Sequence, residues 1–252
     1  MSYTQTITIA KGTAVDTIGK ALALVNTSNP VIYIKKGEYD INAMYLMSKS
    51  GSKITWIGEG LDTTVYIHNP AECCNFADEV HFIKIKFECA NDIPPYWSNI
   101  YVMTYWTDST KAVFENCLFN ISKDGLKPNQ NFFFFNNSYA AHFSNKIFIN
   151  CTFNAKDIRS VGSIGYATFI NCLYNTNELI TSTNGESTIA NTLKDDIDQE
   201  TYKPVNLKYN SVGIYGGEYA INKQVPSEKI KSSVKDTILN HKMFEYITRR
   251  ED

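Results

Sequence analysis

Five aromatic residues crowd into a short stretch near the middle of the chain and are its clearest candidate for binding chemistry. They are Tyr96, Trp97, Tyr101, Tyr105 and Trp106. Flat aromatic rings can stack on the apolar faces of sugars or become buried against a protein partner. The same rings could also fold back and cover a flank of their own protein. The stretch is therefore a candidate ligand-binding or assembly site, with a purely structural role as the alternative.

Acidic residues that could support sugar chemistry are present, but they do not form a catalytic pattern. Hydrolysis of a glycosidic bond usually requires two carboxylates that flank the bond. The acids nearest the middle of the chain are Asp92, Asp108, Glu115, Asp124 and Asp157. None of them stands in a hydrolase motif, and Arg159 beside Asp157 fits a surface ion pair better than a catalytic base. We therefore predict no catalytic residue.

The histidines and cysteines do not show the spacing of a metal or cofactor site. The four histidines share no ligand spacing; they are His68, His81, His142 and His241. Cys73 and Cys74 are adjacent, whereas the cysteines of metal and redox pairs are commonly separated by two residues. The sequence predicts no metal site and no cofactor.

A seven-residue phrase occurs three times in the centre of the chain. It occupies residues 114–120, 148–154 and 169–175, each time with the pattern Phe-x-Asn-Cys-x-aromatic-Asn. Such recurrence is typical of a solenoid, in which each coil repeats one strand–turn–strand unit and stacks on the coil before it. The first asparagine of each phrase tolerates the left-handed backbone of a tight corner, and its amide can bond to the asparagine of the next coil. We predict a structural ladder of Asn116, Asn150 and Asn171.

The residues after each corner predict an interior of thiols and rings. Alternate positions point to the same face of a strand. Here they are occupied first by Cys117, Cys151 and Cys172, and then by Phe119, Phe153 and Tyr174. We expect the three cysteines to be free thiols in the core. Residues 82–87 fit the same frame with Lys84 in the asparagine position, where we expect a differently built corner.

The beginning of the chain predicts a capped first coil. We expect an amphipathic helix over about residues 14–26, with a capped start at Thr13 and Asp16. Its helical spacing is carried by Ile18, Ala21, Leu22 and Val25. Short strands are expected at 31–34, 39–41, 54–57 and 65–67. A helix placed here can cover the exposed first coil of a solenoid.

Two N-terminal segments resemble the opening of the pectin lyase-like right-handed parallel β-helix superfamily, in particular its pectinesterase-like branch. The segments are DTIGKALALVNTSNPVIYIKKGEYDI, from residue 16, and ITWIGEGLDTTVYI, from residue 54. The repeated phrase is similar to middle coils of that superfamily, and residues 212–217 are similar to the segment that often closes its last coil. The resemblance covers about residues 5–222. It implies an all-β fold, a single-stranded right-handed parallel β-helix.

The resemblance does not fix an activity. The superfamily includes esterases, lyases, hydrolases, viral tailspikes and inert scaffolds. A pectinesterase would carry two aspartates on successive coils and a Leu-Gly-Arg phrase, and these are missing here.

The composition fits one elongated domain. With 252 residues, 43% of them hydrophobic, the chain can bury a substantial core. We expect a β-helix domain over residues 1–222 and a short helical tail over 223–252, which could cap the last coil or dock on another chain. The net charge of −2 does not indicate a basic surface that would bind nucleic acid. No segment has the apolar length of a membrane span.

These observations favour a non-catalytic scaffold that recognises a glycan or cell-surface receptor, or that assembles with other subunits or copies of itself. The start of the chain lacks a signal peptide, which together with the free thiols and aromatic strands fits a bacteriophage or phage-derived tail protein of a virion. Such a protein is made in the cytoplasm and released by lysis. One alternative is a carbohydrate-active enzyme of the same fold: a polysaccharide lyase, glycoside hydrolase or pectinesterase-like protein. Another is a structural subunit without a ligand.

Overall fold

The computed structural model describes residues 5–68, 76–89, 99–104, 110–120, 131–136, 146–154, 167–175, 188–217 and 219–221. The strands of this part are β1 (Thr6–Ile9), β2 (Val31–Ile34), β3 (Gly37–Ile41), β4 (Ile54–Ile67), β5 (Val80–Cys89), β6 (Asn99–Thr104), β7 (Ala112–Glu115), β8 (Leu118–Asn120), β9 (Asn131–Asn136), β10 (Lys146–Ile149), β11 (Thr152–Asn154), β12 (Thr168–Ile170), β13 (Leu173–Tyr174), β14 (Thr188–Ala190) and β15 (Leu193–Lys194). The helical elements are α1 (Ile18–Leu24) and the 3-10 turns η1 (Met44–Met47), η3 (Leu207–Tyr209) and η4 (Gly213–Tyr215).

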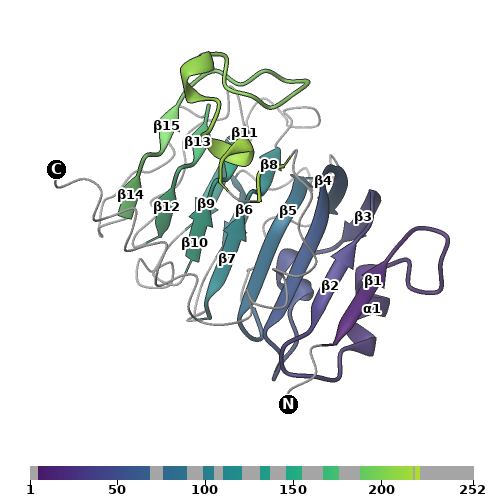
Figure 1. Ribbon diagram of the computed structural model, residues 1–252. Helices are drawn as coiled ribbons and strands as arrows, with labels where there is room; N and C mark the ends of the chain where they lie inside the picture. The colour runs from purple at the N-terminus through teal and green to yellow at the C-terminus, as the bar shows by residue number, and fades with distance from the viewer. Residues whose placement is uncertain are drawn as a thin grey trace.

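The strands stack in parallel, coil upon coil. Strands β7, β10, β12 and β14 form the column before each corner, and β8, β11, β13 and β15 form the column after it. The longer strands β4 and β5 run through both columns. Figure 1 shows the stack advancing from β1 at the N-terminal end to β14 and β15 at the other end. The predicted fold class is confirmed: the chain is an all-β, right-handed parallel β-helix.

The corner between the two columns has the same backbone in five successive coils. Its residues have positive φ angles of 57° at Lys84, 52° at Asn116, 51° at Asn150, 54° at Asn171 and 48° at Asn191. Asparagine adopts this left-handed conformation more readily than most residues. The expectation of a different corner at Lys84 was wrong for the backbone, because Lys84 has the same left-handed φ as Asn116 in the next coil.

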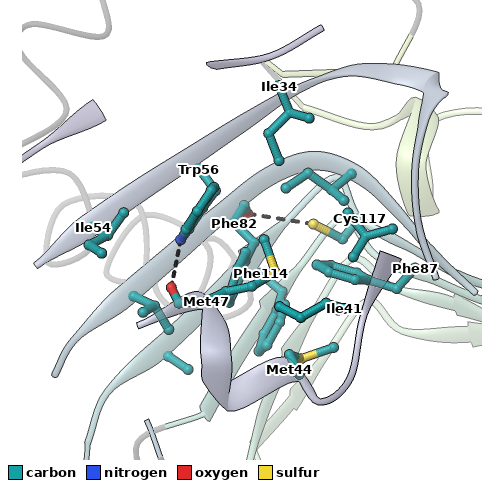
Figure 2. Packing of buried hydrophobic residues seen from close by; sticks show 14 of the residues in the cluster. Ile34, Ile41, Met44, Met47, Ile54, Trp56, Phe82, Phe87, Phe114 and Cys117 are labelled. Atoms are coloured by element: carbon teal, nitrogen blue, oxygen red, sulfur yellow. Dashed lines mark hydrogen bonds between the residues drawn. The ribbon is translucent and has the colours of Figure 1, made fainter. Parts of the chain in front are cut away.

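Two stacks of phenylalanine rings fill the core. Phe82, Phe114, Phe148 and Phe169 stack with ring centroids 5.0 Å apart. Phe87, Phe119 and Phe153 form the second stack, with centroids 5.5 and 5.0 Å apart. Rings of the two stacks meet edge to face within a coil, which is a favoured aromatic arrangement. Figure 2 shows the N-terminal part of this core, where Trp56 donates a hydrogen bond of 2.8 Å to the carbonyl of Met47.

The N-terminal cap is shorter than the sequence predicts. The helix α1 covers Ile18–Leu24, and its N-cap is Thr17, whose side chain accepts from the backbone N–H of Lys20 at 3.2 Å. Asp16 does not cap the helix but forms an ion pair with Lys20 at 2.7 Å. The buried face of the helix, Ile18 and Ala21, packs into the same core as β1 and β2. The helix α1 therefore covers the N-terminal end of the core, as the sequence predicts.

The aromatic stretch between two coils also contains a regular strand. The strand β6 pairs in parallel with β9, so that Tyr101 lies opposite Phe133 and Ile100 opposite Phe132. These two strands form a separate two-stranded sheet outside the main sheet of thirteen strands. Residues 99–104 and 131–136 therefore pair with each other and not with the repeated phrases.

The chain turns back after the last strand and runs along the outside of the coils. We call residues 195–217 and 219–221 the C-terminal strap. Asn116 Nδ2 donates to the carbonyls of Ile214 and Gly216 at 3.0 and 2.8 Å. Further along, Tyr219 packs against Ile57 and Ile83. Figure 1 shows the strap in green, crossing back over the sheet near β11 and β8.

The course of the strap corrects one expectation from the sequence. Residues 212–217 resembled a segment that closes the last coil, but they lie outside the coils, over the corners at Asn116, Asn150 and Asn171. The hydrogen bonds of the corner side chains hold them there. The expected helical tail over 223–252 lies outside the described residues.

Candidate functional site

Most of the aromatic candidate site lies outside the described residues. This holds for Tyr96, Trp97, Tyr105 and Trp106. Tyr101 belongs to β6, which pairs with β9. The role of these five residues in binding or assembly therefore stays a prediction.

The corner asparagines form a chain of side-chain hydrogen bonds inside the molecule. Asn171 Nδ2 donates to Asn150 Oδ1 at 2.6 Å, and Asn191 Nδ2 donates to Asn171 Oδ1 at 2.6 Å. Asn116 departs from this pattern, because its amide nitrogen donates to two strap carbonyls. These asparagines join the coils to one another and to the strap, which is a structural role.

The three predicted thiols lie in the core. Each cysteine donates to the carbonyl of the phenylalanine one coil earlier, with Sγ to oxygen distances of 3.5, 3.3 and 3.4 Å for Cys117, Cys151 and Cys172. All three are buried free thiols. Burial raises the pKa of the Cys151 thiol, so it stays protonated and is a poor nucleophile.

A line of polar side chains runs along the outside of the column after the corner. It has one member per coil, and we call it the polar row: Asp40, Tyr66, Glu88, Asn120, Asn154 and Asn175. The first five are aligned by the parallel register of β3, β4, β5, β8 and β11. Their strand neighbours point the opposite way, into the ring stack, which orients the polar row outward. The row is accessible in part: Asp40 is exposed and Asn120 is half-buried, whereas Asn154 is buried.

The C-terminal half of the polar row is a second asparagine ladder. Asn154 Nδ2 donates to Asn120 Oδ1 at 2.7 Å, and Asn175 Nδ2 donates to Asn154 Oδ1 at 2.7 Å. Asn120 Nδ2 in turn donates to Glu88 Oε1 at 2.8 Å. The amides therefore have fixed orientations before any ligand arrives.

The N-terminal half of the polar row is acidic. The Tyr66 hydroxyl donates to Glu38 Oε1 at 3.3 Å. Burial, together with the charges of Glu88 and Glu38, raises the pKa of Tyr66 to about 12. This hydroxyl therefore remains a neutral donor at physiological pH. Asp40 lies 2.8 Å from His68 Nε2 at the end of the row.

The strap supplies further groups to the edge of the row. Gln199 exchanges hydrogen bonds with Asn154: its Oε1 accepts at 2.9 Å, and its Nε2 donates at 3.2 Å. Lys86 Nζ lies 5.6 Å from the ring centroid of Tyr202 and 2.5 Å from Glu88 Oε1. Although burial opposes it, the Glu88 carboxylate raises the pKa of Lys86, so the ammonium form of this lysine is favoured.

The acids considered for catalysis do not assemble into a catalytic pair among the described residues. Glu115 is buried, and its Oε2 lies 3.4 Å from His81 Nε2 on the neighbouring strand. No second carboxylate contacts this pair in the described part of the chain. The other candidates, Asp92, Asp108, Asp124, Asp157 and Arg159, lie outside it.

Neither a metal site nor a membrane span emerges from the described residues. They contain no group of three or more His, Cys, Asp or Glu side chains that could hold a metal ion. None of their helices is long and apolar enough to cross a bilayer.

The sequence interpretation missed the polar row, although part of its signal was visible. The last residue of each repeated phrase is an asparagine, at positions 120, 154 and 175. Its period matches that of the corner asparagine, but it lies one position after an inward-facing ring and must face outward. Tyr66 and Glu88 belong to no repeated phrase, and only the strand register places them in line with the asparagines.

Comparison with known proteins adds little to this description. No family model matches the chain, and no curated protein matches it. One solved structure with a similar course of the backbone is the pectin methylesterase from Aspergillus niger, in a penultimately deglycosylated form with an N-acetylglucosamine stub at its residue 84. The alignment covers 90% of this chain and 100% of the other, with 13% sequence identity and a TM-score of 0.37.

Proposed function

We propose that this chain is a non-catalytic β-helix protein that binds a glycan along the polar row. The observation that carries the proposal is the alignment of one outward polar side chain per coil, from Asp40 to Asn175. Neighbouring strands of a sheet lie about 4.8 Å apart. This spacing is close to the advance of one sugar unit in an extended polysaccharide, so successive coils can bond successive sugars.

The chemistry of the row suits sugar hydroxyls. An amide both donates and accepts, as a hydroxyl does, and Asn120 uses only one N–H and one lone pair in its two hydrogen bonds. Its remaining N–H and lone pair can bond a ligand. Because the ladder already fixes the amide orientation, binding costs less conformational entropy than it would for free side chains.

The proposal is tested by measuring affinity for a panel of oligosaccharides with the wild type, Asn120→Ala and Tyr66→Phe. We expect each substitution to weaken binding at least tenfold, about 1.4 kcal/mol, because each removes a hydrogen-bonding group from the row. Asn26→Ala is the matched control: it removes an exposed amide beside α1 and should bind as the wild type does. Equal affinity of all four proteins, with unchanged thermal unfolding, would refute the proposal.

The same panel separates recognition from catalysis. A polysaccharide-degrading enzyme would release reducing ends or unsaturated products, and a carbohydrate esterase would release acid. The expected result is binding without product. Product formation by the wild type would replace this proposal with the enzyme alternative.

We also propose that the protein works as part of a particle, such as a phage tail, alongside other subunits. The support is the sequence resemblance to a superfamily that includes viral tailspikes, together with the long, rigid shape of a coil stack. Co-purification of the chain with virion or tail proteins from lysed cells tests this setting.

A further inference from the structure

The two halves of the polar row differ in charge. The N-terminal half carries the carboxylates of Asp40 and Glu88, and the carboxylate of Glu38 lies beside it as the acceptor of the Tyr66 hydroxyl. The C-terminal half carries the amides of Asn120, Asn154 and Asn175, joined at its edge by Gln199. A ligand that spans the row therefore meets negative charge at one end and neutral amides at the other.

The cations that contact the row are already paired with its acids. Lys86 lies 2.5 Å from Glu88, and His68 lies 2.8 Å from Asp40. Glu38 has the hydroxyl of Tyr66 as its donor, and this donor is neutral. Within the described residues, no lysine, arginine or histidine is in contact with Glu38.

Among the described residues, an anionic sugar would meet cations only where they already belong to ion pairs of the row. A carboxylate of the ligand would lose water while it faces like charges of the row, and these cations would have to leave their present partners to bind it. A neutral sugar avoids this cost. An ammonium group of an amino sugar would donate a charge-assisted hydrogen bond to Glu38 or Asp40.

We infer that the polar row selects neutral sugars and amino sugars and rejects uronic acid polymers. This inference rests on the proposed function, and it narrows the class of ligand. The inferred selectivity does not follow from the fold, because another protein with the same coils could carry the opposite charge on this face.

The test compares hexamers of β-1,4-linked glucose, glucosamine and glucuronate, and the corresponding galactose series. Within each series the linkage is constant, and the sugars differ in the group at C2 or C6 and in its charge. At low salt we expect the uronate to bind at least tenfold more weakly than the neutral hexamer, and the amino form to bind at least as tightly. Raising the salt should reduce both differences, because exposed charges are screened.

A pair of matched variants separates local from overall charge. Glu38→Gln keeps an acceptor for the Tyr66 hydroxyl and removes one negative charge beside the row. Asp16→Asn removes one negative charge beside α1. We expect Glu38→Gln to narrow the discrimination between neutral and uronate hexamers about threefold or more, and Asp16→Asn to leave it unchanged. Equal effects of the two variants would overturn a role for the row in selectivity.

The two proposals fail in different ways. If no hexamer binds, the proposed function is refuted and the selectivity with it. If uronates bind most tightly and Asn120→Ala weakens that binding, the row is a glycan site and only the inferred selectivity is wrong.

Discussion

Two asparagines in each repeated phrase lie in different environments. The first, such as Asn171, forms the corner and bonds inside the molecule, while the second, such as Asn175, faces outward and bonds along the polar row. The corner asparagine combines two contributions, a left-handed backbone and the hydrogen bonds of its side chain. Substitution at one position can separate them.

We predict that Asn171→Ala lowers the free energy of unfolding by about 2–3 kcal/mol. The alanine loses the bonds to Asn150, Asn191 and the strap carbonyl of Ser211, and it also strains the corner at φ 54°. Asn171→Gly is the control, because glycine adopts this backbone freely. If the hydrogen bonds carry most of the stability, the glycine variant remains clearly destabilised in urea unfolding. If glycine restores wild-type stability, the ladder contributes little.

A second prediction at this scale concerns alkaline pH and Cys151. Burial raises the pKa of this thiol in the folded state, so the native state favours the protonated form. The associated stability is complete below the pKa of an unfolded thiol, about 8.5, and is lost as pH rises toward the folded pKa. Relative to Cys151→Ala, the wild type should lose up to about 1.4 kcal/mol per pH unit above pH 9. Parallel stability curves from pH 8 to 10 would contradict the buried assignment.

Among the elements, the C-terminal strap depends on small residues where it crosses the corners. A Cβ on Gly216 would overlap the carbonyl oxygen of Ser211 and lie 2.5 Å from Asn171 Nδ2. Gly217 meets Asn150 in the same way and has φ 71°. The strap can therefore approach the ladder closely only because these side chains are absent.

We predict that Gly216→Ala destabilises the protein by about 1–3 kcal/mol, as expected for overpacking of a buried contact. It should also make the strap more sensitive to limited proteolysis. Gly19→Ala is a matched control, because a Cβ there meets nothing within 4 Å and the position lies within α1. Wild-type stability and protease resistance of Gly216→Ala would show that the strap does not need this close approach.

For the whole molecule, the sequence predicted the coils far better than the strap. Phrases that contain Asn116, Asn150 and Asn171 repeat because each coil makes the same local turn and the same contacts with its neighbours. The strap makes a different contact at each point. Its residues have no period, and their partners lie as far as 100 positions away in the chain, as between Asn116 and Gly216.

The polar row could be predicted from the sequence only in part. Its asparagines follow the repeat, so Asn120 and Asn154 could have been assigned to an outer face. Its acidic half could not, because the alignment of Tyr66 with Glu88 depends on the register shifts between β4 and β5 near Gly60. The role of the aromatic stretch in binding or assembly was predicted from its composition alone. It stays a prediction.

The strap also sets an order of events during synthesis. Asn116 emerges from the ribosome 100 residues before Gly216, whose carbonyl it will bond. At roughly 5–20 residues per second, this delay is about 5–20 seconds. Throughout that time the nascent coils expose a corner amide and an apolar flank around Leu118 that only the last part of the described chain covers. Until the strap has been synthesised, chaperones or a neighbouring copy on the same messenger RNA can bind these exposed groups.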